Sequence, residues 1–247
     1  MAAKTTTERF RRRFAKLHID PLEHRNAPTP AISVGSNINA SFQTGNQNET
    51  AIAVNPTNTN NWIAVSNDDT LANANGGHFL SYTPNAGASW NKYYIGSSST
   101  PTLPDSAGDP TIAFDRFGNA YAGYLSNAGG LNAIAVVASG NGGASFSNNS
   151  PVVTAGSYDQ PKIATGVDFT NAARDTVWVT YQDNSGTISA AGASSTALGS
   201  WNAFNTPAAI VNTSNMNYGD IAVGQTGQVL RSEEHTSELQ SPYVISY

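Results

Sequence analysis

The stretch "TPNAGASW", Thr83–Trp90, recurs as "SGNGGASF", Ser139–Phe146, and both fit the pattern Ser/Thr-x-Asn-x-Gly-x-Ser-aromatic. Asparagine at the third position can bond the backbone groups that follow it, and glycine at the fifth position permits a positive φ. The pattern therefore predicts a hairpin tip, after which the aromatic residue begins a strand and packs inward between sheets. A third stretch, "SSTALGSW", Ser194–Trp201, keeps the last serine and the tryptophan. The residues assigned to these three turns are Asn85, Gly87, Ser89, Trp90, Asn141, Gly143, Ser145, Phe146, Ser200 and Trp201.

A longer repeat surrounds these octapeptides. Four segments align on an isoleucine, with spacings of 60, 51 and 58 residues between the successive anchors Ile52, Ile112, Ile163 and Ile221. The aromatic residue of each octapeptide follows its anchor by 38, 34 and 38 residues, so the octapeptides occupy equivalent places. Short apolar runs separated by Asn-, Asp- and Gly-rich turns indicate antiparallel strands. Four such strands in one unit describe a β-propeller blade, and blades must stack around an axis to bury their faces.

The octapeptides resemble the Asp-boxes, or bacterial neuraminidase repeats, of sialidase-like propellers, with asparagine in place of the usual aspartate. The resemblance implies an all-β, six-bladed sialidase-like β-propeller in which each box joins the third and fourth strands of a blade. The predicted propeller domain spans residues 31–230, with blades that start near residues 49, 109, 160 and 218. About three to three and a half blades are therefore expected. The boxes identify a fold and not a reaction, because they also occur outside sialidases.

Residues 1–30 differ from this domain in composition, since seven of the twelve basic residues lie between Lys4 and Arg25. The segment lacks the unbroken apolar run of a secretory signal peptide. It resembles the short leader with a Leu-Glu-x-Arg core, here Leu22, Glu23 and Arg25, of many surface proteins of some environmental bacteria. That resemblance implies an exported bacterial protein located outside the cell or on its surface. The alternative is a disordered basic tail.

Residues 231–247, "RSEEHTSELQSPYVISY", also stand apart, because they concentrate charge in a chain with only 12% charged residues. The stretch resembles the translation of a common sequencing-library adapter. We therefore expect it to be an artefact outside the propeller, and the chain to be a fragment of a longer protein.

The charge of the central part excludes some partners. Between residues 31 and 230 there are four basic and eleven acidic residues, a net charge of −7, which disfavours nucleic acid. No stretch reaches the apolar length of a membrane span. The chain has no cysteine, so disulfides and thiolate metal sites are excluded. The resemblance to sialidase-like propellers makes carbohydrate the expected partner class.

A ligand site is expected where the innermost strands begin. The residues three positions before each anchor are polar, and they should surround one mouth of the central channel: Glu49, Asp109, Gln160 and Tyr218. One interpretation is a ligand site shared between blades, with Asp109 or Glu49 available for proton transfer. The alternative is that these residues bond main-chain amides at the start of each strand.

Sialidase chemistry, as the resemblance implies it, needs three arginines for the substrate carboxylate, a Tyr–Glu nucleophile pair and an aspartate acid/base. The expected Phe/Tyr-Arg-Ile-Pro motif is absent from the sequence, and Arg116 and Arg174 are expected in turns. The chain itself is therefore expected to be inactive. A non-catalytic glycan or surface recognition module is favoured. The alternatives are an exo-α-sialidase-type glycoside hydrolase and an architectural repeat of a surface protein.

No cofactor or metal site is assigned. Calcium is the one ion considered, because "NDD" at Asn67–Asp69 and "QDNSG" at Gln182–Gly186 cluster side-chain oxygens; loop caps are the preferred interpretation. An open half-propeller would expose strand edges and an apolar blade face, which predicts self-association.

Overall fold

Of the 247 residues, the computed structural model describes 35–68, 77–97, 102–127, 132–183, 185–234 and 243–245. The chain divides into two compact units, Met1–Asn37 and Ile38–Tyr247. The first unit contributes residues 35–37, which have no regular secondary structure. The second unit is built from strands, and the described residues contain no helix. Accordingly, that part of the chain has no helix long and apolar enough to cross a bilayer.

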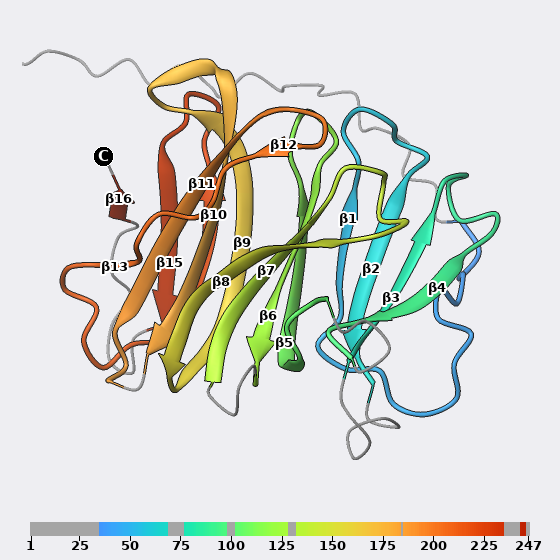
Figure 1. Ribbon diagram of the computed structural model, residues 1–247, viewed down its shortest axis with the longest axis horizontal. Coiled ribbons are helices and arrows are strands. Elements are labelled where there is room, and N and C mark those ends of the chain that lie inside the picture. The colour runs from blue at the N-terminus through green and yellow to red at the C-terminus, as the bar shows by residue number, and fades with distance from the viewer. Residues whose placement is uncertain are drawn as a thin grey trace, which may run out of the picture. The chain divides into compact units, whose positions relative to one another are not determined.

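The strands form four antiparallel sheets that follow one another along the chain (Figure 1). The first sheet consists of β1 (Ala51–Val54), β2 (Trp62–Asn67), β3 (His78–Thr83) and β4 (Asn91–Ile95). The second sheet consists of β5 (Ser106–Phe114), β6 (Ala120–Ser126), β7 (Asn132–Ser139) and β8 (Ser147–Gly156). In both sheets each strand pairs with the next strand in sequence.

The third and fourth sheets continue this meander. The third contains β9 (Tyr158–Asp168), β10 (Asn171–Asp183), β11 (Ile188–Ala197) and β12 (Ser200–Trp201), with β13 (Ala208–Ala209) also paired to β11. The fourth contains β14 (Asn217–Val223), β15 (Val229–Glu234) and β16 (Tyr243–Ile245). β15 therefore continues through Arg231 into the stretch that resembles an adapter, and the origin of that stretch stays a prediction.

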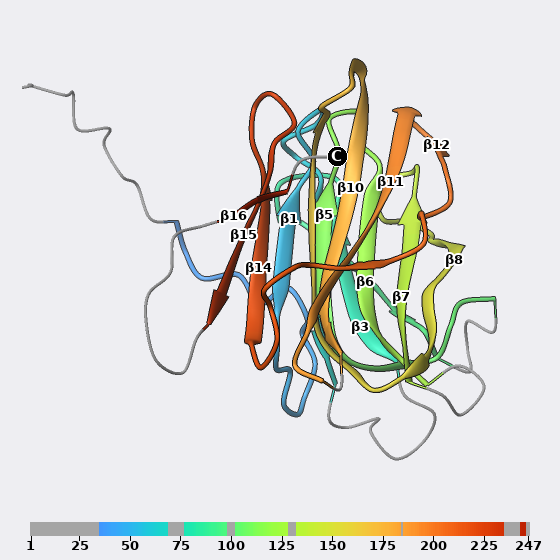
Figure 2. The same ribbon diagram turned by 90° about the vertical axis from the view of Figure 1, so that its left-hand side faces the viewer.

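The first strands of neighbouring sheets lie together: β1 contacts β5, β5 contacts β9, and β9 contacts β14. Figure 2 shows β14, β1 and β5 near one side of the unit, with β7, β8, β11 and β12 farther across. This is the arrangement of propeller blades, in which the first strands line the axis. We call β1, β5, β9 and β14 the inner strands.

Three hydrophobic clusters hold the sheets against one another. The first lies between sheets one and two and includes Ile63, Leu80 and Tyr124. The second lies between sheets two and three and includes Tyr121 and Val179. The third lies between sheets three and four and consists of Trp178, Ile221 and Val229, with Ala164 and Val223 packed against it. Alternate residues of the middle strands therefore face opposite neighbours, as the period of a strand requires.

The register of the inner strands repeats from sheet to sheet. The anchor isoleucine is followed by an alanine in all four sheets, and that alanine pairs with a large apolar residue of the second strand. The four pairs are Ala53 with Ile63, Ala113 with Tyr121, Ala164 with Trp178, and Ala222 with Leu230. The predicted repeat thus corresponds to equivalent strand positions.

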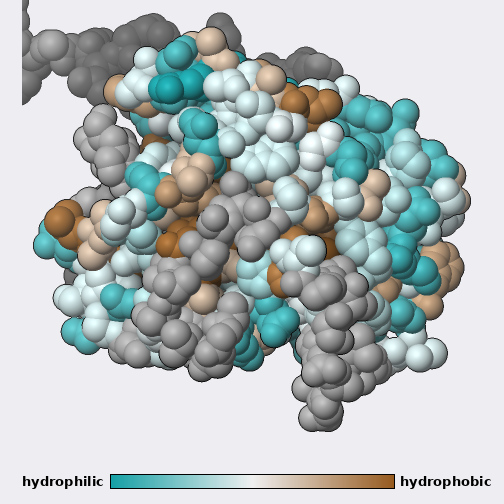
Figure 3. Space-filling view, in the orientation of Figure 1, coloured by the Kyte–Doolittle hydropathy of each residue, from teal (hydrophilic) through white to brown (hydrophobic). Residues whose placement is uncertain are grey.

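Hydrophobic side chains are less clustered on the surface than in the core. On the face shown in Figure 3, hydrophobic side chains of the described residues form small, separate groups among polar ones.

Candidate binding site at the start of the inner strands

Three of the four predicted ligand residues share an uncommon backbone conformation. Glu49, Asp109 and Gln160 have φ values of 51°, 53° and 51°. The register shifts at Asp109 in the β5–β6 pairing and at Gln160 in the β9–β10 pairing, so both residues form β-bulges. Left-handed φ costs a non-glycine residue about 1 kcal/mol or more, so each bulge needs local compensation. Tyr218 lies at a register shift in β14, but its side chain falls outside the described residues.

Hydrogen bonds between sheets supply that compensation. Glu49 Oε2 accepts the main-chain N–H of Asp109 at 3.1 Å, and Asp109 Oδ2 accepts the main-chain N–H of Gln160 at 3.0 Å. Asn67 Nδ2 donates to Glu49 Oε2 at 2.6 Å from the end of β2. The structure therefore brings Glu49, Asp109 and Gln160 together as one inner-strand site, in which each carboxylate bonds the backbone of the following sheet.

The two carboxylates of the inner-strand site differ in proton affinity. Burial, followed by hydrogen bonding to Glu49, raises the pKa of Asp109 to about 7. The hydrogen bond from Asp109 lowers the pKa of Glu49, and a further bond from Asn67 acts in the same direction. Below a pH of about 7, Asp109 therefore carries a proton while Glu49 is ionised.

This geometry limits the chemistry of the pair. Glycosidases place their two carboxyl groups about 5 Å apart or farther, so that a sugar and a nucleophile fit between them. Glu49 and Asp109 instead bond each other directly and also accept main-chain N–H groups. The arrangement matches the interpretation of these residues as strand-start acceptors. Gln160 keeps a half-buried side chain at the same end, beside the exposed Asp159.

The arginines of the propeller domain are engaged elsewhere. Arg116, in the β5–β6 turn, forms an ion pair with Asp175 (Nε to Oδ1, 2.6 Å) and donates to the carbonyl of Ala172. Arg174 pairs with Asp168 at 2.8 Å. Arg174 lies within β10 and not in a turn, because the β9–β10 hairpin extends to Asp168 and Asn171. Neither arginine is part of the inner-strand site.

The octapeptides occupy the connections between third and fourth strands: β3–β4, β7–β8 and β11–β12. In the first, Asn85 Oδ1 accepts from Thr83 Oγ1 at 2.8 Å and from the N–H of Ser89 at 2.9 Å. Asn141 makes the same pair of bonds in the second. Gly87 and Gly143 have φ values of 85° and 92°, as the turn requires.

The aromatic residues of these turns pack against neighbouring rings or clusters. Phe146 packs on the cluster between sheets one and two. Trp201 lies edge-on to Tyr121 of the second sheet, at 6.2 Å between ring centroids. Trp90 differs, because its ring neighbour is Trp62 of its own sheet, at 6.4 Å.

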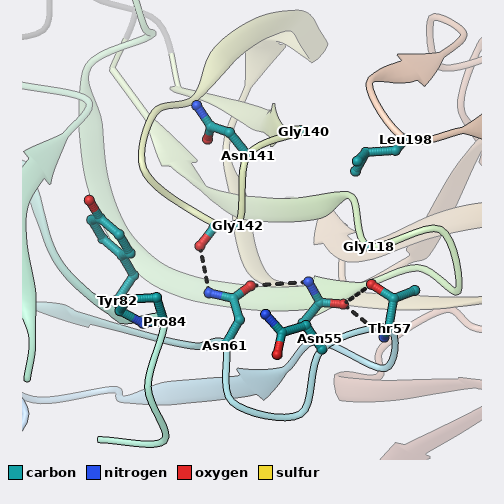
Figure 4. A pocket seen from close by; sticks show the side chains of 11 residues that line it. Asn55, Thr57, Asn61, Tyr82, Pro84, Gly118, Gly140, Asn141, Gly142 and Leu198 are labelled. Carbon is teal, nitrogen blue, oxygen red and sulfur yellow. Dashed lines mark hydrogen bonds between the residues drawn. The ribbon is translucent and has the colours of Figure 1, made fainter. Parts of the chain in front are cut away.

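Two buried asparagines that the sequence interpretation missed connect the sheets at the opposite end. Asn61 Nδ2 donates to the carbonyl of Gly142 at 2.9 Å, as Figure 4 shows. Asn119 Nδ2 donates to the carbonyl of Ala197 at 3.0 Å. Both acceptors occupy the fourth position of the next sheet's octapeptide. The available signal was an asparagine directly before the second strand in two successive repeats.

A pocket of about 260 Å³ lies at this end, between the β1–β2 turn and the octapeptide of the second sheet. Its lining includes Asn55 and Asn61, which bond each other at 3.1 Å, and Tyr82 (Figure 4). Asn55 also accepts hydrogen bonds from Thr57. The buried amide of Asn55 therefore stabilises the β1–β2 turn, and that of Asn61 stabilises the contact between the sheets.

Of the two stretches considered for calcium, Gln182–Gly186 acts as a loop cap where it is described, whereas Asn67 and Asp68 bond the side chains of Glu49 and Tyr94. Asp183 Oδ1 accepts from Ser185 and from the N–H of Thr187, and Asp68 accepts from Tyr94. Asp69 and Asn184 lie outside the described residues. Within the described ranges, no group of three or more His, Cys, Asp or Glu side chains could hold a metal ion.

No protein-family model and no curated protein sequence matches the chain. Solved structures, by contrast, share its fold. The GH93 α-L-arabinofuranosidase of Fusarium graminearum, in complex with arabinobiose, has a TM-score of 0.53 at 10% identity, over 84% of this chain and 63% of that one. The Penicillium chrysogenum α-L-arabinanase, also with arabinobiose, has a TM-score of 0.54 at 10% identity, over 80% and 60%. A mutant of AofleA from Arthrobotrys oligospora gives 0.51 at 9%, over 81% and 54%.

The chain therefore spans less than two thirds of each of these proteins. At such low identity the likeness concerns the fold alone, because one fold carries many activities. Together with the four antiparallel sheets and their adjoining inner strands, it confirms the fold class predicted from the repeats: this chain is an all-β protein with the sialidase-like β-propeller fold.

Proposed function

We propose that the chain belongs to an exported propeller protein that recognises carbohydrate without cleaving it. Two neighbours of the same fold are bound to arabinobiose, which supports carbohydrate as the ligand class. Propeller ligands meet the end of the axis where loops and strand starts converge, so we assign recognition to the inner-strand site and its surroundings.

The observation that carries this proposal is the engagement of both carboxylates. Glu49 and Asp109 each accept a main-chain N–H from the next sheet, at 3.1 and 3.0 Å. A carboxylate that leaves its acceptor role to attack or protonate a substrate would remove the hydrogen bond between sheets at a strained bulge, and at Gln160 only the bond to Asp159 Oδ1, at 2.9 Å, would remain. The inner-strand site is therefore better suited to hold a rigid surface than to perform acid/base chemistry.

A glycoside hydrolase is the second candidate, favoured by one specific observation. The pKa of Asp109 is raised to about 7 while that of Glu49 is lowered, and such separation is typical of an acid/base pair. The main-chain N–H groups that both carboxylates accept oppose this role, because they hold the two side chains in place at the start of the inner strands.

A glycan array that carries arabinan oligosaccharides and sialylated glycans, probed with the full chain, tests the proposal. We expect binding to one of these classes, weakened about tenfold or more by Gln160→Ala. Asn58→Ala, at the opposite end of the first sheet, is the matched control and should bind normally. Absence of binding to both classes would contradict the proposal, and so would release of free sugar, measured by chromatography, that Asp109→Asn abolishes.

Export is a separate part of the proposal and rests on residues 1–30. Fusion of this segment to a reporter enzyme in a bacterial host should deliver activity outside the cytoplasm. A reporter that stays in the cytoplasm would remove the support for a surface location.

A further inference from the structure

The octapeptide of the second sheet contains the dipeptide Asn141–Gly142, whose sequence favours loss of the side-chain amide. In any asparagine, the main-chain nitrogen of the following residue can attack the side-chain carbonyl carbon. A following glycine makes this attack easier, because it has no side chain to hinder the approach and its backbone turns more freely. The equivalent dipeptide of the first octapeptide is Asn85–Ala86, in which a methyl group hinders the approach. The chain therefore contains a reactive asparagine and a matched, less reactive one.

The two dipeptides also differ in the hydrogen bonding of the attacking nitrogen. The N–H of Ala86 donates to the carbonyl of Asn60 at 2.8 Å, so this nitrogen is held in place. The N–H of Gly142, by contrast, donates to none of the residues that the structure describes. A nitrogen without such a bond can rotate toward a neighbouring carbon and lose its proton to water. Sequence and structure thus favour attack at the same asparagine.

The amide that would be attacked is exposed and polarised. Asn141 Oδ1 accepts hydrogen bonds from Ser139 Oγ at 2.8 Å and from the N–H of Ser145 at 3.0 Å. Attack on Cγ develops negative charge on Oδ1, and two fixed donors stabilise such a charge. Asn85 is also exposed and has two equivalent donors. The main-chain nitrogen, and not the amide, therefore distinguishes the two positions.

The contact between sheets one and two keeps glycine next to Asn141. Gly142 has a φ of 72°, and its carbonyl accepts a hydrogen bond from Asn61 Nδ2 at 2.9 Å. A β-carbon at Gly142 would lie 2.9 Å from Oδ1 of the same buried asparagine, which is too close. Replacement of the glycine would therefore disturb the contact between the sheets, so the fold itself retains the reactive dipeptide.

The turn can accommodate aspartate in place of Asn141. A carboxylate oxygen accepts the same two hydrogen bonds as Oδ1. Ser145 Oγ now accepts from Asn141 Nδ2 at 2.8 Å, and its hydroxyl can instead donate to the second carboxylate oxygen. Conversion to aspartate therefore adds one negative charge to the turn without removing a hydrogen bond. Isoaspartate would not fit in this way, because it inserts an additional carbon atom into the main chain.

We propose that Asn141 is a site of spontaneous deamidation, which slowly converts it into aspartate in the folded chain. The nitrogen of Gly142 loses its proton and bonds Cγ of Asn141, the bond from Cγ to Nδ2 breaks, and the amide leaves as ammonia. The resulting succinimide ring takes up water, which cleaves one of the two bonds between the ring nitrogen and its carbonyl carbons. Cleavage at Cγ gives aspartate, and cleavage at the main-chain carbon gives isoaspartate. Water is the only co-reactant.

Peptide mapping by mass spectrometry tests this proposal on the full, folded chain. The chain is incubated at mildly alkaline pH in water enriched in heavy oxygen and is then cleaved with chymotrypsin. We expect the peptide with Asn141 to gain the mass of an acid and one heavy oxygen atom about tenfold faster, or more, than the peptide with Asn85. Equal rates, or no reaction at Asn141, would overturn the proposal. A second Asn–Gly dipeptide, Asn75–Gly76, lies outside the described residues and is found in a separate peptide.

Ala86→Gly separates the effect of the sequence from that of the hydrogen bond. Ala86 already has a φ of 55°, so glycine fits there, and the N–H to the carbonyl of Asn60 is retained. In the folded variant Asn85 should still react more slowly than Asn141, whereas in concentrated urea the two should react at similar rates. Equal rates in the folded variant would show that the hydrogen bond does not protect Asn85. A slow reaction of Asn85 in urea as well would assign the difference to neighbouring residues, and either result would contradict the proposal.

Asn141→Asp tests whether the turn accepts the product. The variant should melt at the temperature of the unmodified chain, and its octapeptide should gain no further mass during incubation. A clear loss of stability would show that the folded turn opposes the conversion, which would also count against the proposal.

Discussion

The carboxylate of Asp109 accepts the main-chain N–H of Gln160, 3.0 Å from Oδ2, and thereby connects the inner strands of two successive sheets. Glu49 does the same for Asp109, and the buried Asn61 and Asn119 connect the sheets at their other end. In each case a side chain of one sheet bonds the backbone of the next. Because these bonds lie at both ends of the sheets, they fix the angle between neighbours in addition to the apolar clusters.

Protonation of Asp109 should make stability depend on pH. Its folded-state pKa is about 7, above the ordinary 3.8, so its contribution is present at low pH and is lost as the pH rises through 7. Asp109→Asn keeps an acceptor for Gln160 without ionising. At pH 4 and at pH 8 we compare the unfolding free energy of the variant with that of the unmodified chain. From the lower to the higher pH, this difference should shift by about 1 to 2 kcal/mol in favour of the variant, after allowance for solvent screening. Urea titrations at both pH values measure this, with Asp220→Asn as the control; a constant difference would contradict it.

His78 should give the opposite dependence. It is buried, lies edge-on to Tyr124 at 5.1 Å between ring centroids, and burial lowers its pKa to about 4. Its contribution is therefore present above the ordinary value of 6.5 and is lost as the pH falls through 4. As the pH falls from about 7 to about 4, the unfolding free energy of His78→Phe should decrease by about 2 to 3 kcal/mol less than that of the unmodified chain. Equal losses in thermal melts at the two pH values would show that His78 does not carry this effect.

Removal of the Asn119 amide should weaken the contact between sheets two and three. The side chain is fully buried, and it donates to the carbonyl of Ala197 and accepts the N–H of Gly199. Asn119→Ala leaves both groups unsatisfied, so unfolding free energy should fall by about 2 to 3 kcal/mol. Asn58→Ala, at an exposed position, should change it by less than about 0.5 kcal/mol. Denaturant unfolding that finds equal effects would disprove the role of Asn119.

The octapeptide glycines allow strain and clash to be separated. A β-carbon at Gly143, where φ is 92°, would lie 2.6 Å from Cδ1 of the buried Ile63. At Gly199, where φ is 74°, it would meet nothing within 4 Å. Gly199→Ala should therefore lower the unfolding free energy by about 1 kcal/mol, from backbone conformation alone. Gly143→Ala should lower it by about 2 to 4 kcal/mol, because the clash with Ile63 adds to the backbone cost. Equal losses in unfolding free energy would indicate that the first two sheets pack less tightly at this point.

The sequence predicts the elements that depend on local pattern. The octapeptides and the anchor isoleucines locate the third-to-fourth connections and the inner strands, because turn chemistry and apolar alternation are local properties. The bulges at Asp109 and Gln160 were less visible, since neither residue is a glycine. Pro110 and Pro161 follow them, and a proline inside a strand is an available sign of a bulge or an edge.

Contacts between sheets could not be predicted in the same way. The partners of Asn61 and Asn119 are main-chain carbonyls about 80 residues away, and a carbonyl leaves no trace in the amino-acid sequence. The raised pKa of Asp109 and the lowered pKa of Glu49 likewise depend on a proximity that only stacking of the sheets creates. The polar character of the inner-strand positions was evident, but their role as acceptors for the next sheet required the structure.

Successive sheets are joined by hydrogen bonds from side chains to main-chain groups, and this affects how such a chain can evolve. An acceptor or donor in the main chain is the same whatever residue supplies it, so a duplicated unit placed between two existing ones finds matching groups on both sides. Gene duplication can therefore change the number of units, and later substitutions can diversify their outward-facing residues, without a compensating change in the neighbours.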